Sequence, residues 1–257
     1  MRVLTWNVAG RASRQAEQAA AVVAVGADLV ALQEVTKRTL PAWLAALEEA
    51  GYAHHADTVA LAPPERRRPL GVLTAAREPL TALDPPAVPW PERVLVTAHG
   101  DLQLVNLHSP IAPAPELAKI RTHEAVAAYL GAQPHSPRVL CGDLNTPRRE
   151  HADGSVLTFA HASSGRLRPE RGERWDAAER ALVHTLRAEH GWLDAFRALH
   201  GYEHREASWT FAQDRGGWRL DHVLVSPDVT VERCEYHHEW RLDGLSDHSA
   251  MECDLTW

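Results

Sequence analysis

Two short segments of the sequence carry residues whose types and spacing suit hydrolysis. Gly142-Asp143-Leu144-Asn145 places a carboxylate and a carboxamide two positions apart, so both side chains point the same way at the end of an extended strand. Ser246-Asp247-His248 places another carboxylate beside an imidazole. Attack of water on a phosphodiester needs a base to activate the water, an amide to hold it and a donor to stabilise the charged phosphorus. Together the two segments can supply all three.

Other polar side chains follow apolar, strand-like runs at several places in the chain. These residues are Asn7, Glu34, His108 and Asp221. The ends of buried strands are where α/β proteins place their ligands, so this repetition is more informative than any one residue. We therefore expect these side chains to meet Asp143 and His248 in one site.

Glu34 follows a buried run, where a carboxylate is unfavourable unless it caps a helix or binds a cation. Taken alone, it is typical of an acid at a helix N-terminus near Thr36. Beside Asn7 and Asp247, it predicts an oxygen-rich site for Mg²⁺ or Mn²⁺, because hard cations prefer one or two carboxylates together with water.

The two histidines have different expected roles. His108 ends a strand and could act as a general acid or as a donor to a phosphate oxygen, although a lone histidine is more often structural. Asp221 could fix the tautomer of His248 through an Asp–His hydrogen bond. For the segments 142–145 and 246–248, the alternative interpretation is an ordinary turn. At 142–145 a turn is compatible with a site.

Size and charge limit the possible classes of protein. The 257 residues are 45% hydrophobic, and no Ser/Gly linker divides them, so we expect a single domain over 1–257. The net charge of −7 argues against a protein that coats nucleic acid non-specifically. It is compatible with an enzyme that holds one phosphate through a metal ion and a few arginines.

The sequence contains no run typical of a transmembrane segment and no secretory leader, because Met1-Arg2 passes directly into a strand-like run. We therefore expect a cytoplasmic protein. The three cysteines, Cys141, Cys234 and Cys253, are far apart and are expected to be buried thiols rather than a disulfide framework or a zinc site.

The hydropathy pattern alternates between strand-like and helical segments, which is typical of an α/β protein. Strands are expected at residues 3–8, 28–33, 71–74, 93–96, 102–107, 138–141, 208–211, 218–225 and 250–255. Helices are expected at residues 12–25, 40–50, 116–130 and 176–190. Residues 148–175 are polar and are expected to form a long loop or lid.

Three weaker features have two interpretations each. Trp209 and Phe211 could stack on a nucleobase, but aromatic residues on a strand are more often part of the core. The run 65–68 (Glu-Arg-Arg-Arg) could touch phosphates, but a solvated loop is more common. His54-His55 and His237-His238 are expected at the surface.

Six short motifs occur in the order seen in the endonuclease/exonuclease/phosphatase superfamily, and the chain resembles that superfamily from residue 6 to residue 248. The motifs are Trp6-Asn7, Leu32-Gln33-Glu34, Leu107-His108-Ser109, Gly142-Asp143-Leu144-Asn145, Arg219-Leu220-Asp221-His222 and Ser246-Asp247-His248. The resemblance implies a four-layer α/β sandwich, in which two mixed β-sheets pack face to face and helices lie on the outer faces. It also implies divalent-metal-dependent hydrolysis of phosphoesters.

Several segments look like the exonuclease III and apurinic endonuclease branch. The sequence differs from that branch at Ala9 and at Leu107-His108-Ser109. The His108-Ser109 pair is similar to pancreatic-type deoxyribonuclease.

The resemblance also implies a role for each matching residue. Asn7 and Glu34 match the metal positions, and Asp247 matches a residue at the metal edge. Asp143 matches the residue that activates water, and Asn145 matches the one that orients it. His248 matches the imidazole that contacts the scissile phosphate, with Asp221 as its orienting partner.

The leading hypothesis from the sequence is a Mg²⁺- or Mn²⁺-dependent phosphodiesterase, and specifically a monomeric nuclease that hydrolyses DNA and does not act at a membrane. A phosphatase or phosphodiesterase for a small phosphoester or lipid headgroup is the alternative. A non-catalytic binding module is a third interpretation, against which the intact set of polar residues argues.

Overall fold

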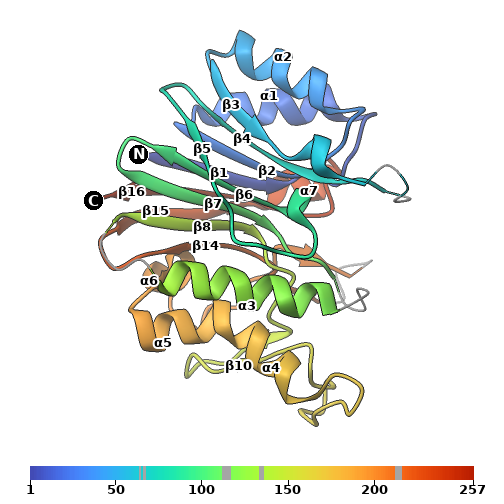
Figure 1. The fold of residues 1–257 in the computed structure, drawn as a ribbon, viewed down its shortest axis with the longest axis vertical. Helices are drawn as coiled ribbons and strands as arrows, with labels where there is room; N and C mark the ends of the chain where they lie inside the picture. Colours follow the sequence, from blue (N-terminus) through green and yellow to red (C-terminus); the bar gives the residue numbers. More distant parts are fainter. Residues whose placement is uncertain (64, 66–67, 112–116, 133–135, 212–215) are drawn as a thin grey trace.

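The computed structural model describes residues 1–63, 65, 68–111, 117–132, 136–211 and 216–257. Two β-sheets lie against each other in the middle of the molecule, and helices lie on their outer sides (Figure 1). The two chain termini are neighbours, because the first and last strands pair with each other.

The first sheet has six strands in the order β15-β16-β1-β2-β4-β3. Its strands are β1 (Arg2–Asn7), β2 (Leu29–Val35), β3 (His54–Asp57), β4 (Gly71–Ala76), β15 (Thr230–His237) and β16 (Ala250–Thr256). Only the β1–β2 pair in this sheet is parallel, so the sheet is mixed.

The second sheet also has six strands, in the order β11-β14-β8-β7-β6-β5. Its strands are β5 (Thr81–Leu83), β6 (Val94–His99), β7 (Leu102–His108), β8 (Arg138–Asp143), β11 (Leu193–Asp194) and β14 (Asp221–Val225). Here β7 and β8 form the parallel pair. Two small hairpins stand apart: β9 (Arg149–Glu150) with β10 (Val156–Leu157), and β12 (Trp209–Thr210) with β13 (Gly217–Trp218).

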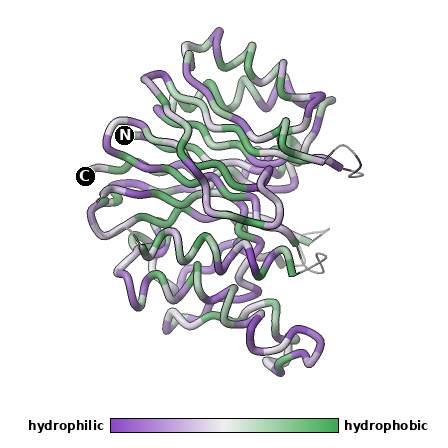
Figure 2. Tube along the Cα trace, viewed as in Figure 1, coloured by the Kyte–Doolittle hydropathy of each residue, from purple (hydrophilic) through white to green (hydrophobic). Residues whose placement is uncertain are grey.

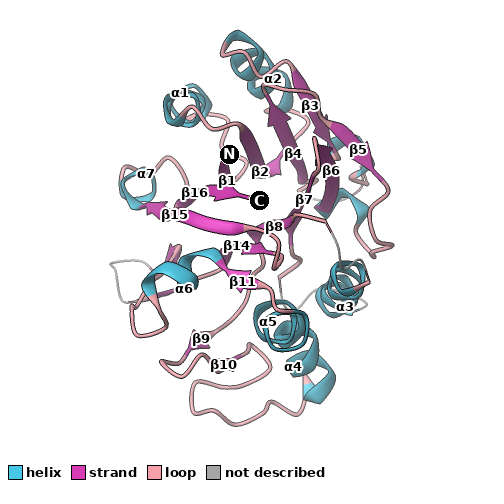
Figure 3. Ribbon diagram, turned by 90° about the vertical axis from the view of Figure 1, so that its left-hand side faces the viewer, coloured by secondary structure: helices cyan, strands magenta, loops and turns pink. Residues whose placement is uncertain are grey.

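Helices cover both outer faces, as the end-on view shows (Figure 3). The first sheet is covered by α1 (Gln15–Val25), α2 (Leu40–Glu49) and α7 (His238–Leu242). The second is covered by α3 (Ala118–Gly131), the π-helical turn Ala181–Thr185 and α5 (Leu186–His190), and α4 (Gly172–Arg180) packs on α3. The short α6 (Ala195–His200) packs beside β14 and β15. The remaining short elements are the 3₁₀ turns Val59–Leu61 and Pro91–Arg93.

The four-layer arrangement explains why the strands are almost continuously apolar. Alternate residues of one strand enter different cores: in β1, Val3 packs between the two sheets, while Leu4 and Trp6 pack under the helices. Figure 2 shows stretches of hydrophobic residues along the strands of both sheets. A strand buried on both faces needs apolar side chains on both. The fold is the four-layer sandwich of two mixed sheets that the resemblance implied, and that prediction is confirmed.

Gly142 allows β8 to approach β7 closely at the end of the second sheet. Its φ angle is +126°, and a Cβ atom there would lie 2.1 Å from the carbonyl oxygen of Leu107. No residue with a side chain fits this position without moving the backbone. The close approach fixes Asp143 beside His108 in the parallel register of the two strands.

Several elements differ from the sequence expectations. The strands β3 and β15 were not expected, and residues 148–175 contain the β9–β10 hairpin and the first turn of α4 instead of only a loop. His237 is half-buried, since it pairs with Glu252 at 2.8 Å and stacks on Trp240. The expected helix start at Glu116 lies outside the described residues. The three cysteines are buried, as expected. In the described part of the chain, no helix has the length and hydropathy needed to span a bilayer.

Candidate active site

The predicted site residues meet at one end of the double sheet because of strand direction. The parallel pairs β1–β2 and β7–β8 bring their carboxyl ends to this end, and the antiparallel β14 and β16 begin there. The register places His108 beside Asp143 and Asp143 opposite Asp221. The sequence therefore predicted correctly that the ends of these strands lie together.

Glu34 reaches the site through a distortion of β2. The pairing of β2 with β4 shifts register between Gln33 and Val35, so Glu34 is a bulge residue, and its φ angle is +61°. A left-handed conformation is unfavourable for a residue with a side chain, and such residues are concentrated at functional sites. The bulge redirects the carboxylate of Glu34 towards the strand ends, while Gln33 stays buried between the sheets.

Asn7 lies between two carboxylates. Its Nδ2 donates to Asp143 Oδ2 at 3.0 Å and to Glu34 Oε1 at 3.4 Å, and its Oδ1 accepts from the backbone N–H of Ala9 at 3.0 Å. The hydroxyl of Ser246 donates to the Asn7 carbonyl at 2.6 Å. This hydrogen bond connects Asn7 at the end of β1 to the segment that carries His248.

Asp143 and Asn145 form one turn. The backbone N–H of Asn145 donates to Asp143 Oδ1 at 2.9 Å, and Asn145 has a φ angle of +51°. The Asn145 amide donates to the carbonyl of Ser109 at 2.8 Å, and its own carbonyl accepts from Lys119 Nζ at 2.7 Å. The motif therefore forms a turn, and the same turn places Asp143 and Asn145 in the site.

His248 lies between two acids. Asp221 Oδ2 contacts its Nδ1 at 2.8 Å, and Asp143 Oδ2 lies 3.9 Å from its Nε2. Burial opposes the charged imidazole, but Asp221 and Asp143 outweigh burial and raise the pKa of His248 to about 10. Burial and the Asp221 charge raise the pKa of Asp143 to about 7, although His248 opposes them. His248 is thus a cation at neutral pH.

His108 is buried beside the same carboxylates. Its Nε2 lies 3.6 Å from Glu34 Oε1 and 3.8 Å from Asp143 Oδ2. The Nη1 atom of Arg93 lies closest to Nδ1 of the ring, and it is 3.1 Å from Nε2. Burial and the Arg93 charge hold the pKa of His108 well below its usual range, so the imidazole is neutral.

The site lies in a pocket of about 480 Å³. Asp247 is exposed and lies at its edge. The other walls are basic and aromatic. They include Lys119, Arg148, Arg168, Arg171, Phe159, Trp209 and Trp218.

The aromatic residues of this wall correct one sequence interpretation. Trp209 stacks on Trp218 with ring centroids 5.2 Å apart and an interplanar angle of 12°, and Phe211 packs edge-on against Trp218. Trp209 is only half-buried and Phe211 is 39% exposed. The expectation that Trp209 and Phe211 are core residues is wrong, because β12 belongs to a small hairpin at the pocket and not to either main sheet.

Sequence reasoning missed two charged groups at the site and did not favour a third, Arg68, which it expected in a solvated loop. Arg68 Nη2 lies 2.9 Å from Glu34 Oε2, so part of the 65–68 run reaches the site; Arg66 and Arg67 lie outside the described residues. Arg93 contacts His108. Lys119 and Glu179 form a fully buried ion pair of 2.6 Å behind Asn145. A lysine on the apolar face of a helix was the only signal in the sequence for this pair.

The donor set fits a hard divalent cation. Among the described residues, Glu34 Oε1 has only long contacts, at 3.4 Å to Asn7 Nδ2 and 3.6 Å to His108 Nε2, so none of them makes a close hydrogen bond to this oxygen. Asp221 Oδ1 is buried without a hydrogen-bond partner in the described part of the chain. Asp143, Asp221 and His248 also converge within 4.8 Å, but this group includes a nitrogen donor, whereas a hard cation prefers oxygen donors. The oxygen-rich side at Glu34 is the better fit.

Comparison with solved structures identifies proteins of the same fold. An AP endonuclease from Archaeoglobus fulgidus matches with 20% identity and a TM-score of 0.74. A 3'-5' exonuclease from Neisseria meningitidis matches with 20% identity and a TM-score of 0.69, and a 3' phosphatase from Neisseria bound to a product DNA hairpin with 21% and 0.68. All of this chain and all of each matched chain are covered.

No curated protein sequence matches the chain significantly. The sequence does match the Endonuclease/Exonuclease/phosphatase family over residues 4–248, which is nearly the whole chain and includes every predicted site residue. Members of this family are divalent-metal-dependent phosphoesterases. The chain therefore belongs to the Endonuclease/Exonuclease/phosphatase family and is a phosphoester hydrolase.

Proposed function

We propose that this protein is a Mg²⁺- or Mn²⁺-dependent phosphodiesterase that acts on DNA. The observation that carries the proposal is the meeting of Glu34, Asp143, Asn145 and the Asp221–His248 pair under a pocket with arginine and tryptophan walls. Hydrolysis of a phosphodiester needs a cation site, a base, an amide and a donor. This set supplies each of them within one pocket.

Glu34 is the residue that would hold the cation directly, with Asn7 and Asp247 at its sides. When bound there, the cation would polarise a non-bridging or leaving oxygen of the phosphate. Asn7 holds the carboxylates of Glu34 and Asp143 in place through its amide hydrogens. Asp247 is exposed at the edge of the same pocket and would supply a further carboxylate to the cation.

Asp143 takes a proton from the attacking water. Its carboxylate is oriented by the backbone N–H of Asn145 and by Asn7, and its pKa of about 7 suits a base that works at neutral pH. The side-chain amide of Asn145 lies in the same turn and orients the water and the phosphate. The left-handed backbone at Asn145 keeps the amide at the pocket wall.

His248 stabilises the developing negative charge on the phosphorane oxygens. Its imidazole is held as a cation by Asp221, so Nε2–H is available as a charged donor on the pocket side. Asp221 is a positioning residue that also fixes the ring orientation. The side chain of Trp6 fixes the backbone of the same residue through a 2.9 Å hydrogen bond from Nε1 to the His248 carbonyl.

For His108 we assign the role of a neutral donor to a phosphate oxygen. The sequence left two roles open, and protonation of the leaving group is the less favoured one because Arg93 and burial keep the ring uncharged. A neutral imidazole can still donate through one ring nitrogen.

DNA is the preferred substrate for two reasons. The neighbouring structures are described as an AP endonuclease, a 3'-5' exonuclease and a 3' phosphatase with a DNA hairpin. The pocket also combines arginines with a stacked tryptophan pair, which suits phosphates and sugars or bases together. A cytoplasmic monomer with a single domain over 1–257 completes the proposal.

A small phosphoester is the second candidate, and the net charge of −7 favours it. The two substrates are separated by salt. Raising the salt concentration from about 50 to 200 mM is expected to lower kcat/KM for a DNA oligonucleotide more than about tenfold, because several phosphate contacts release counterions. The rate with bis(p-nitrophenyl) phosphate, which has one phosphate, should change little. Turnover of the small ester with no cleavage of DNA would favour the second candidate.

A further inference from the structure

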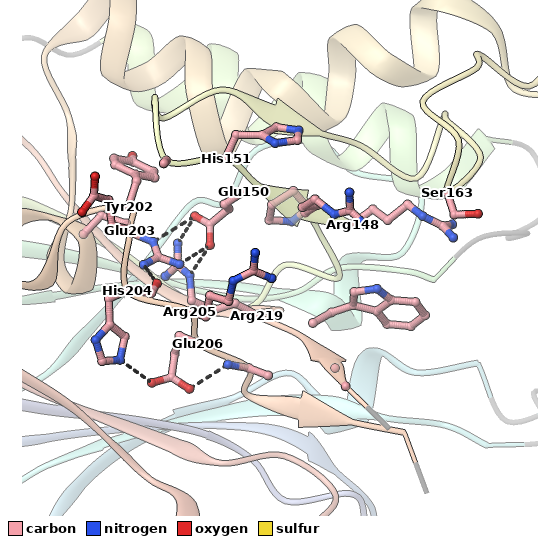
Figure 4. Close-up of a pocket in the computed structure, with 18 of the residues that line it drawn as sticks. Arg148, Glu150, His151, Ser163, Tyr202, Glu203, His204, Arg205, Glu206 and Arg219 are labelled. Atoms are coloured by element: carbon pink, nitrogen blue, oxygen red, sulfur yellow. Dashed lines mark hydrogen bonds and ion pairs between the residues drawn. The ribbon is translucent and has the colours of Figure 1, made fainter. Parts of the chain in front are cut away.

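A second, larger pocket of about 870 Å³ adjoins the active site. The two pockets share Arg148 and Trp218, so these residues form the partition between them. The volume of this second pocket is within the range of ligand-binding clefts. Figure 4 shows this pocket, with Arg148 and Ser163 on one side and the segment 202–206 on the other.

The buried arginines of this pocket are fully paired. Glu150 accepts from Arg197 at 2.7 Å and from Arg219 at 2.6 Å, and Asp194 also accepts from Arg219 at 2.6 Å. The dashed lines in Figure 4 mark the bonds of Glu150 to these two guanidinium groups. These arginines therefore hold the pocket floor together and are not available to a ligand.

Arg148 and Arg149 have a different environment. Within the described ranges, no carboxylate lies within ion-pairing distance of either side chain, and the nearest acid to Arg168 is Glu170 at 4.0 Å. Burial and the charges of Arg168 and Arg149 together lower the pKa of Arg148. Arg148 and Arg168 also act against the charge of Arg171, whose pKa is lowered, with burial as the largest cause.

Like charges in the walls of two adjoining pockets repel one another, and an anion bound among them relieves this repulsion. Arg148 and Arg168 line the catalytic pocket, and Arg148 and Arg149 line the second pocket. An anion between them would therefore lie beside the phosphate that is cleaved, not on it. Trp218 and Phe211 supply aromatic surface next to the same place.

We propose that Arg148, Arg149 and Arg168 form a subsite for a second phosphate of a nucleic-acid strand, adjacent to the scissile phosphate, and that the second pocket receives the nucleotide between them. This inference rests on the proposed function and narrows it. A substrate with a single phosphate cannot use the subsite. The preferred substrate is therefore a strand with at least two consecutive phosphates.

The test measures binding without catalysis. A fluorescein-labelled DNA duplex is titrated with protein in EDTA, and anisotropy gives the Kd at several salt concentrations. The double variant Arg148→Gln/Arg168→Gln should bind at least about tenfold more weakly than wild type, with a salt slope smaller by about one to two. The control Arg166→Gln removes one arginine charge at an exposed position of the same segment that lines neither pocket, and it should bind as wild type does.

Folding is checked separately. Removal of mutually repelling charges should leave the melting temperature of the double variant unchanged or higher, so weaker binding cannot be attributed to unfolding.

The outcomes separate the subsite from the proposed function. Equal binding by the double variant and Arg166→Gln, or no binding by wild type, overturns the subsite. Binding that depends on Arg148 and Arg168, combined with no cleavage when Mg²⁺ or Mn²⁺ is added, supports the subsite and contradicts the proposed nuclease function.

Discussion

Replacing Asp143 with alanine is expected to lower kcat by a factor of about 10² to 10⁴, the range for loss of a general base. Asp143 is buried at the meeting point of Asn7, Asn145 and His248, and no other carboxylate in the described part of the chain has these three neighbours. The measurement is kcat for DNA cleavage with saturating Mg²⁺. His248→Ala should lose activity over a similar range, through the loss of the charged donor.

The fold should survive removal of the Asp143 charge. Because its folded-state pKa of about 7 lies above the ordinary value of 3.8, ionisation of Asp143 lowers stability as the pH rises between those values. At pH 8 in EDTA, Asp143→Asn should therefore unfold at the same or a higher urea concentration than wild type.

The matched control for the activity measurement is Asp101→Ala. Asp101 is an exposed aspartate at the turn between β6 and β7, and this variant should keep full activity. Full activity of Asp143→Ala would remove Asp143 from the mechanism.

The largest effect on stability is expected at Glu179, outside the catalytic set. Glu179 is fully buried, and its carboxylate accepts from Lys119 Nζ at 2.6 Å, Trp175 Nε1 at 2.7 Å and Phe159 N at 2.7 Å. Although burial opposes its charge, Lys119 holds the pKa of Glu179 below its usual range. Glu179→Gln leaves the Lys119 cation buried without a counter-charge, and the free energy of unfolding should fall by about 3–5 kcal/mol. Urea denaturation at pH 7 measures it.

Two further variants test whether the unpaired Lys119 cation causes this loss of stability. Glu173→Gln makes the same chemical change at an exposed position of α4 and should have little effect. Lys119→Met/Glu179→Gln should be more stable than Glu179→Gln alone, because the unpaired cation is gone. If the double variant is no better than the single one, the lost hydrogen bonds and not the ion pair carry the stability. Lys119 also donates to the Asn145 carbonyl, so the double variant, which lacks this donor, should also lose activity.

The sequence predicted correctly which strand ends lie together. Asn7, His108 and Asp143 end their strands at the same end of the sandwich, because parallel strands share their carboxyl ends, and the antiparallel β14 begins there with Asp221. The Asp143–Asn145 turn is local and could be recognised from its residue types. The edge strand β15 was missed, because Glu232, Arg233 and Glu235 interrupt its apolar residues.

Contacts between distant segments could not be predicted. The bulge at Glu34 depends on the pairing of β2 with β4, and the Lys119–Glu179 pair joins positions 60 residues apart. The buried amides of Gln33 and Asn106, bonded at 2.8 Å between the two sheets behind the site, also needed the packed structure. The aromatic hairpin was assigned to the core, because a short apolar run does not reveal which sheet it joins.

The central claim is that this site cleaves DNA with a divalent cation and Asp143. It is tested most directly on a gel with a 5'-labelled DNA duplex that carries one abasic analogue, incubated with Mg²⁺, Mn²⁺ or EDTA. Asp143→Ala serves as the blank. We predict cleavage with either cation that is lost both in EDTA and in the variant. A single cut at the lesion would identify abasic-site specificity, and a ladder or scattered nicks would identify a general nuclease. Intact DNA in every lane, or equal cleavage by Asp143→Ala, would contradict the account.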